Sequence, residues 1–175
     1  HGCASPVFKC EIDKPDENGV GEVLARGQNV MAGYYNNEEA TEAVLQDRWL
    51  KTGDLGRIDE DGNLYIVGRS KDVIIDSNGK NIYPDEIEDI YGKSPLIKEL
   101  SVVGLSDDDG GEKIAALVLP DYEQDISLSR SETNKKVEEY FREISAGIPF
   151  FKRVKVLHLT PFELPRTATR KVKRP

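Results

Sequence analysis

The chain has 175 residues, of which 38% are apolar and 32% charged, and its formal net charge is −8. This composition is typical of a soluble globular protein with one or two small domains, and it argues against general binding to nucleic acid. Its apolar runs fall far short of the roughly 20 residues that a membrane-spanning helix needs. Because the chain begins at His1 rather than Met, we expect a fragment of a longer protein. The two cysteines, Cys3 and Cys10, lie near no further Cys or His at ligand spacing, which fits a reducing, cytoplasmic environment.

The first part of the chain, residues 1–70, is predicted to be rich in short strands. Alternating apolar residues between turn residues indicate strands near 7–12, 21–25, 57–59 and 64–67. Asn36 is expected to cap a short helix, with Glu39 completing a capping box. Thr52-Gly53-Asp54 is predicted to form a tight polar turn.

The most informative stretch is 68–88, GRSKDVIIDSNGKNIYPDEIE. Arg69 and Lys71 follow a predicted strand and have no apolar anchor, which is typical of a joint between two bodies. The pair Asn78-Gly79 predicts a β-hairpin. Pro84 then opens a helix with acidic residues in its first turn, where the helix dipole favours them.

Residues 71–175 are predicted to form an α+β domain of ordinary size. After the hairpin and a helix at 84–91, the pattern gives two antiparallel strands, a long helix and a last strand. Ser129 begins the long helix, with Glu132 completing a capping box. The final residues, 165–174, are strongly basic, which fits either one local anionic partner or a solvated terminus.

Acidic side chains suggest one candidate binding group and no metal site. A carboxylate after Thr-Gly, at Asp54, can accept hydrogen bonds from two adjacent hydroxyls such as those of a ribose, although this segment taken by itself favours an Asx-turn. The acidic turns at 59–63 and 107–109 lack the alternating ligands and distal Glu of a calcium loop. We therefore predict no bound metal from these residues.

Three separated motifs resemble those of the adenylate-forming, or AMP-binding, superfamily. They are WLKTGDL at 49–55, the stretch 68–88 and LPRTATRKVKR at 164–174, and their order, spacing and terminal position match. NGKNIYP at 78–84 looks most like acyl-CoA synthetases that act on long-chain fatty acids. The resemblance implies a small C-terminal α+β domain, a β-hairpin plus a three-stranded sheet with helices, preceded by the β-rich end of a large N-terminal domain.

The resemblance further implies a boundary between 1–70 and 71–175, with a hinge near 69–72, and a two-step reaction. A fatty-acid carboxylate would attack the α-phosphate of ATP, and the thiol of coenzyme A would then displace AMP. ATP, coenzyme A and Mg²⁺, the last held mainly by the N-terminal part of the same chain, are the expected cosubstrates and cofactor. A fatty-acid substrate would also bring the enzyme to membrane surfaces. This chain lacks the phosphate loop and acyl pocket, so we expect it to be inactive alone.

Individual residues match the family motifs position by position. Asp54 resembles the acidic residue that holds the ribose hydroxyls, and Arg69 resembles the arginine that also reaches the nucleotide. Lys71 occupies the hinge position, where a few residues absorb the backbone rotation.

Gly79 and Lys80 match the hairpin tip that lines the pantetheine tunnel, where glycine permits close approach of the backbone. Lys171 resembles the catalytic lysine that bridges the carboxylate and the α-phosphate. The residue before it departs from the family pattern, because Arg170 stands where a glycine is usual.

Two other functions fit the same motifs. One is an adenylation domain that activates an amino or aryl acid for a carrier protein. The other is a non-catalytic α+β interaction module. The presence of Asp54, Arg69 and Lys171 together argues against the module, which would have no physical need for all three.

Overall fold

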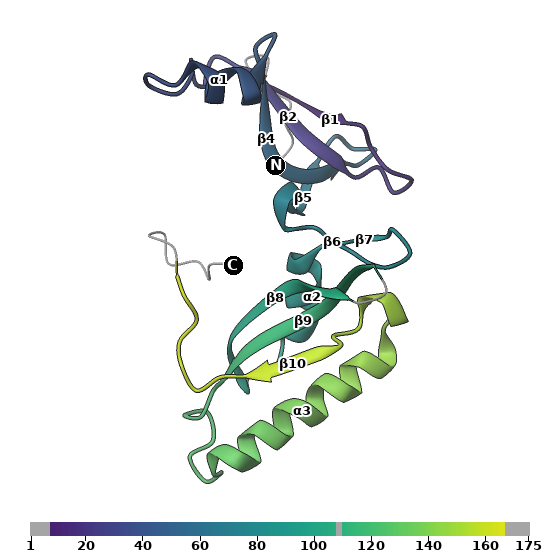
Figure 1. The fold of residues 1–175 in the computed structure, drawn as a ribbon, viewed down its shortest axis with the longest axis vertical. Coiled ribbons are helices and arrows are strands. Elements are labelled where there is room, and N and C mark those ends of the chain that lie inside the picture. The colour runs from purple at the N-terminus through teal and green to yellow at the C-terminus, as the bar shows by residue number, and fades with distance from the viewer. Residues whose placement is uncertain (1–7, 108–109, 167–175) are drawn as a thin grey trace. The chain divides into compact units, whose positions relative to one another are not determined.

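The computed structural model describes residues 8–107 and 110–166. By its internal contacts the chain divides into two units, His1–Lys71 and Asp72–Pro175, here called unit 1 and unit 2. Figure 1 shows an antiparallel sheet in unit 1 and a sheet with two helices in unit 2. No helix within the described residues is long and apolar enough to cross a membrane.

Unit 1 is built on one five-stranded sheet in the order β1-β2-β4-β3, with β5 paired to β4. Its elements are β1 (Phe8–Asp13), β2 (Gly21–Gly27), α1 (Glu38–Val44), β3 (Leu45–Gln46), β4 (Trp49–Ile58) and β5 (Leu64–Arg69). Alternate residues of β2, including Val23 and Ala25, are buried, as expected for a strand with one covered face.

The predicted helix in unit 1 exists, but the predicted cap is wrong by one residue. Asn36 has a φ of 50°, in the left-handed region, so the chain is still bending there. Asn37 is the N-cap, and its side chain accepts a hydrogen bond from the backbone N–H of Ala40 at 3.0 Å. Glu39 therefore lies one position too early for a capping box.

Unit 2 has the predicted α+β composition. Its elements are β6 (Ile74–Ile75), β7 (Asn81–Ile82), α2 (Pro84–Tyr91), β8 (Ile97–Asp107), β9 (Gly111–Pro120), α3 (Arg130–Gly147), the 3₁₀ turn η2 (Phe150–Lys152) and β10 (Val156–Leu159). A further 3₁₀ turn, η1 (Ser70–Asp72), spans the boundary between the units. The three-stranded sheet has the order β10-β9-β8, with β9 antiparallel to β8 and parallel to β10.

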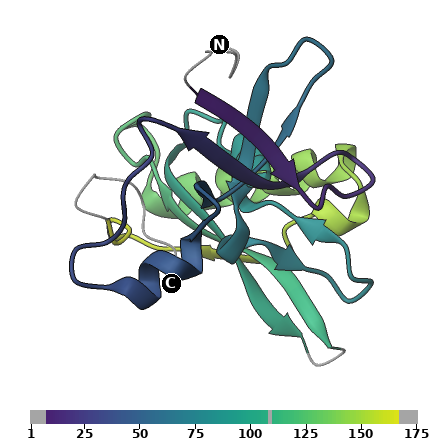
Figure 2. The same cartoon turned by 90° about the horizontal axis from the view of Figure 1, so that it is seen from above.

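The core of unit 2 lies between this sheet and the helices α2 and α3. Figure 2 shows the chain from above, where the two strands of the green β8–β9 hairpin run side by side. The buried cluster is Ile74, Ile82, Ile87, Tyr91, Val102, Ile114, Ala116, Val118, Val137 and Phe141. The rings of Tyr91 and Phe141 stack at 4.6 Å between centroids, which joins α2 to α3.

The start of α3 confirms its predicted capping box. Ser129 is the N-cap, and its hydroxyl accepts from the backbone N–H of Glu132 at 3.3 Å. In return the Glu132 carboxylate accepts from the backbone N–H of Ser129 at 2.8 Å. The helix therefore begins with two of its otherwise unpaired N–H groups satisfied.

The two units should differ in local stability. Among the described residues of unit 1, the buried apolar side chains are Val20, Val23 and Ala25, whereas unit 2 holds a ten-residue core. Amide exchange reports the free energy of local opening. We expect the amides of β2 and β4 to exchange faster than those of β8 and β9 in hydrogen-exchange mass spectrometry. Equal protection of the two pairs of strands would contradict this expectation.

Candidate functional site

The Thr52-Gly53-Asp54 segment lies inside strand β4 and does not reverse the chain, so the predicted tight turn is wrong. Between the pairs Glu22↔Leu55 and Leu24↔Lys51, β2 advances by two residues and β4 by four, which makes these residues a bulge. Gly53 takes a φ of 71°, a conformation that favours glycine. Bulges re-aim side chains and are frequent beside binding sites.

Hydrogen bonds across the sheet explain why the chain bulges at this point. The hydroxyl of Thr52 donates to the carbonyl of Val23 at 2.7 Å, and the N–H of Gly53 donates to Glu22 Oε1 at 3.1 Å. The N–H of Asp54 donates to the Thr52 hydroxyl at 3.1 Å. The polar groups of the segment are thus satisfied by the neighbouring strand, and β4 can continue to Ile58.

Asp54 and Arg69, both predicted to bind nucleotide, are brought together. They are partners across the β4–β5 pair, and Arg69 Nε lies 2.8 Å from Asp54 Oδ1. Their side chains are 33% and 54% exposed, respectively. An ion pair this exposed contributes only about 0–1 kcal/mol to stability. Stability therefore gives little reason for the pair, while its exposure leaves the carboxylate within reach of a ligand.

The hinge candidate, Lys71, is exposed and lies in the 3₁₀ turn η1, at the last position of unit 1. No buried residue occurs in this turn. An element of this kind offers little packing resistance to changes in its backbone dihedrals, which is a property that hinges require.

The hairpin that carries Gly79 and Lys80 closes through a loop rather than a two-residue turn. Asp76 and Lys80 are joined by a bond from the N–H of Asp76 to the carbonyl of Lys80 at 3.1 Å, and Gly79 has a φ of 74°. The Asp76 carboxylate also accepts from the N–H groups of Asn78 and Lys80, at 2.9 and 2.8 Å. Because these bonds favour the ionised carboxylate, above all the one from Lys80, the pKa of Asp76 is lowered.

This hairpin is also held by the start of β9. Glu112 Oε2 accepts from the backbone N–H of Ile75 at 3.0 Å. Gly111 lies so close to the hairpin that a Cβ added to it would meet Ser77 N at 2.6 Å. The base of the hairpin is therefore fixed to the sheet of unit 2. Gly79, at the tip of the hairpin, has open space around it.

Sequence reasoning named Lys80 but missed the cations and aromatic rings that lie with it. The group is here called the cation–aromatic segment: Lys80, Phe150, Phe151, Arg153 and Lys155. Lys80 Nζ lies 4.5 Å from the centre of the Phe151 ring, and Lys155 Nζ lies 3.1 Å from that of Phe150. Arg153 Cζ lies 5.8 Å from the Phe150 ring. Burial lowers the pKa of Lys155, and the charge of Arg153 lowers it further. The sequence signal was the run PFFKRVK at 149–155.

Lys171, the predicted catalytic lysine, lies outside the described residues, as does Arg170. The description of this segment ends at Arg166, whose guanidinium contacts the buried carboxylate of Glu99.

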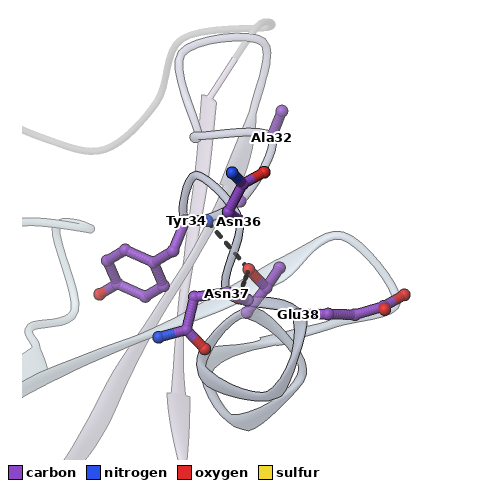
Figure 3. A pocket seen from close by; sticks show the side chains of 7 residues that line it. Ala32, Tyr34, Asn36, Asn37 and Glu38 are labelled. Atoms are coloured by element: carbon purple, nitrogen blue, oxygen red, sulfur yellow. Dashed lines mark hydrogen bonds between the residues drawn. The ribbon is translucent and has the colours of Figure 1, made fainter.

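A shallow hollow of about 510 Å³ lies at the start of α1 in unit 1 (Figure 3). Its lining includes Tyr34 and Asn37, and Thr41 connects them: the Thr41 hydroxyl accepts from Tyr34 N at 2.9 Å and donates to the Asn37 carbonyl at 2.8 Å. These bonds complete the turn that leads into the helix. None of the predicted site residues lines this hollow.

Comparisons with known proteins agree with the motifs. Residues 86–171 match the family model for the AMP-binding enzyme C-terminal domain. A 2-succinylbenzoate–CoA ligase of Bacillus cereus is 38% identical over 97% of this chain and 34% of its own length. An indoleacetate–CoA ligase of Aromatoleum aromaticum is 46% identical over 68% of this chain and 24% of its own length.

A solved structure has the same fold. The o-succinylbenzoate CoA synthetase of Bacillus subtilis, in complex with its acyl-adenylate intermediate, aligns with a TM-score of 0.77 and 32% identity, over 95% of this chain and 33% of that one. Unit 2 thus has the fold of the C-terminal domain of the adenylate-forming enzymes. The chain belongs to the family of adenylate-forming acid–CoA ligases, and it spans about one third of the length of the curated relatives that it matches.

The lowered pKa of Asp76 gives a pH test of the hairpin. A carboxyl whose pKa is lower in the folded state stabilises the fold above its unfolded pKa, and that stability is lost as the pH falls through the folded pKa. We expect the amide signals of Asn78 and Lys80 to titrate together with a midpoint below 3.8, the usual value for the group. The measurement is an NMR pH titration of this chain.

The matched control for this titration is Asp76→Asn, which keeps an acceptor oxygen but cannot ionise. It should abolish the shared transition at both amides. A wild-type midpoint at or above 3.8 would show that the carboxylate is not held by these hydrogen bonds.

Proposed function

We propose that this chain is part of an AMP-forming carboxylate–CoA ligase whose acid substrate contains an aromatic ring. A carboxylate oxygen attacks the α-phosphate of ATP and displaces pyrophosphate, giving an acyl-adenylate. The sulfur of coenzyme A then attacks the acyl carbon, loses its proton and displaces AMP. The observation that carries this proposal is the similarity over 97% of the chain to 2-succinylbenzoate–CoA ligase.

The nucleotide would be bound in unit 1 by the Asp54–Arg69 pair. Asp54 accepts from Arg69 Nε through Oδ1. A carboxylate offers about four lone-pair sites, so it can also accept from two neighbouring ribose hydroxyls. Arg69 adds a permanent positive charge next to a ligand that carries phosphates.

Lys171 would stabilise the adenylation transition state. Negative charge from the attacking carboxylate and the α-phosphate concentrates at one place in that step, and a cation placed there lowers the barrier. The assignment rests on the LPRTATRKVKR motif, and Arg170 adds a second cation next to it.

Coenzyme A would approach along the hairpin and the cation–aromatic segment of unit 2. Gly79 leaves the hairpin tip without a side chain and with open space around it, which suits a narrow pantetheine arm. Phe150 is 71% exposed, and cations flank its ring. Exposed aromatic rings can stack on adenine, and lysine and arginine bind phosphates, so the segment complements the nucleotide end of coenzyme A.

We assign no step to Mg²⁺ in this part of the enzyme. Within residues 8–107 and 110–166, no three His, Cys, Asp or Glu side chains are grouped to hold a metal ion.

The comparisons bear on the class of acid substrate. They favour the aryl acid of the alternative interpretation over the fatty acid of the main one. The motif at 78–84 predicts a long-chain fatty acid, whereas similar relatives include ligases of 2-succinylbenzoate and indoleacetate. Both names denote acids with an aromatic ring. The hairpin motif is therefore a poor guide to the acid, which is reasonable because its proposed role is toward the thiol substrate common to all these ligases.

Substitution of Lys171 should separate the two half-reactions in the full-length protein that contains this chain. Lys171→Ala should lower ATP–pyrophosphate exchange about 10²–10³-fold, because the transition state loses one preorganised charge. Thioester formation from pre-made acyl-adenylate and coenzyme A should stay within a few-fold of wild type. The matched control is Lys173→Ala, which removes a charge from the same segment.

Equal rates for wild type and Lys171→Ala in both half-reactions would reject the assignment. A loss in Lys173→Ala as large as that in Lys171→Ala would mean that the positive charge of the tail matters rather than one lysine.

A substrate panel tests the acid class. We expect pyrophosphate exchange with 2-succinylbenzoate or indoleacetate to exceed that with palmitate by at least tenfold in kcat/KM, since an aromatic pocket and an alkyl channel differ in shape. The measurement uses the same full-length protein. A preference for palmitate would return the assignment to the fatty-acid ligases.

A further inference from the structure

Glu99, near the start of β8, is a buried carboxylate that joins two distant parts of the chain. The residue is 7% exposed, and its side chain 4%. Its Oε2 accepts from the backbone N–H of Leu164 at 2.8 Å, and its Oε1 accepts from Nη2 of Arg166. Each oxygen thus has a donor from the segment that follows β10, more than sixty residues later in the sequence.

Stability alone is a weak reason for this arrangement. Charged side chains are almost never fully buried unless they are paired, and an apolar replacement of similar size is often at least as stabilising as a buried ion pair. Within the described ranges, Glu99 is the one charged residue among the buried polar residues; the others are Ser101 and Thr133. A buried charge with two directed bonds fixes position and orientation, which apolar packing alone does less well.

We propose that Glu99 is a positioning residue for adenylation: it anchors Leu164 and Arg166 and so fixes where the chain starts toward Lys171. This inference rests on the proposed role of Lys171. Leu164 adds to the anchor, because it is itself buried, at 4% exposure. Arg166 is the last described residue, five positions before Lys171.

The length of chain between anchor and lysine makes the point quantitative. Five residues span at most about 18 Å when fully extended. The anchor therefore limits how far from Arg166 the backbone of Lys171 can lie.

Loss of the Glu99 bonds would also change the orientation of the chain at Arg166. A catalytic group misplaced by about 1 Å through a distant mutation can lose about 10²-fold in rate. The loss expected on weakening the anchor is therefore up to about 10²-fold. It should fall on kcat for adenylation, because only that step uses Lys171.

The experiment compares variants of the full-length protein in the two half-reactions, with saturating substrates. Glu99→Gln replaces the carboxylate with an amide, which has one acceptor oxygen and one NH₂ donor group. Of the two groups that donate to Glu99, Leu164 N–H and Arg166 Nη2, one would then face a donor instead of an acceptor. Arg166→Leu breaks the same contact from the exposed side, where the side chain is 43% exposed, so folding is less at risk. Glu88→Gln is the matched control, because Glu88 Oε1 also accepts a backbone N–H of β8, from Val102 at 2.8 Å, and this bond joins β8 to α2.

The proposal predicts that Glu99→Gln and Arg166→Leu lower kcat for pyrophosphate exchange at least threefold and leave thioester formation from pre-made acyl-adenylate unchanged. Glu88→Gln should not separate the two steps. If Glu99→Gln and Arg166→Leu both exchange pyrophosphate at the wild-type rate, or if they lower both half-reactions equally, the positioning role is overturned. Lys171→Ala, run beside them, distinguishes this failure from failure of the proposed function, in which Lys171→Ala would itself leave pyrophosphate exchange intact.

Discussion

The antiparallel pairing of β8 with β9 is the interaction on which unit 2 depends. Its register runs from Ile97↔Pro120 to Asp107↔Gly111, and its inner face supplies Val102, Ile114, Ala116 and Val118 to the buried core. The ladder also carries two anchoring carboxylates. Glu99 holds the tail near one end, and Glu112, paired with Ser106, holds the hairpin near the other. Seven residues separate Glu99 from Ser106 along β8, or roughly 24 Å at about 3.4 Å per residue.

This separation bears on the proposed reaction. The hairpin with Gly79 is fixed near one end of this ladder, and Leu164 and Arg166 are fixed near the other. The proposal assigns the hairpin and Lys171 to different half-reactions. A single orientation of unit 2 would have difficulty presenting both ends to one reacting carbon. Two orientations, reached through the solvated turn at Lys71, would present them in succession, which is a hinge motion of the ordinary kind.

Local patterns were sufficient to predict most of unit 2. The helix at 84–91, the antiparallel strand pair and the capping box at Ser129 all appear, because each is specified by neighbouring residues. The motif also identified Asp54 and Arg69, which the structure pairs. The predicted turn at Thr52–Asp54 failed because its bonds go to Val23 and Glu22, on another strand. The local sequence does not indicate hydrogen bonds to residues on another strand.

Glu99 is a second residue whose contacts the local sequence does not predict. In β8, the even-numbered Val102 faces the core with the helices, so the odd-numbered Glu99 and Ser101 lie on the other face by strand alternation. Polar residues at alternate positions predict a solvated face. Both are nevertheless buried, and Leu164 contacts this face through its bond to Glu99. The polar face of β8 therefore contacts the chain's own segment after β10, and Glu99, which alternation places on a solvated face, is the buried charge that holds Leu164 and Arg166 there.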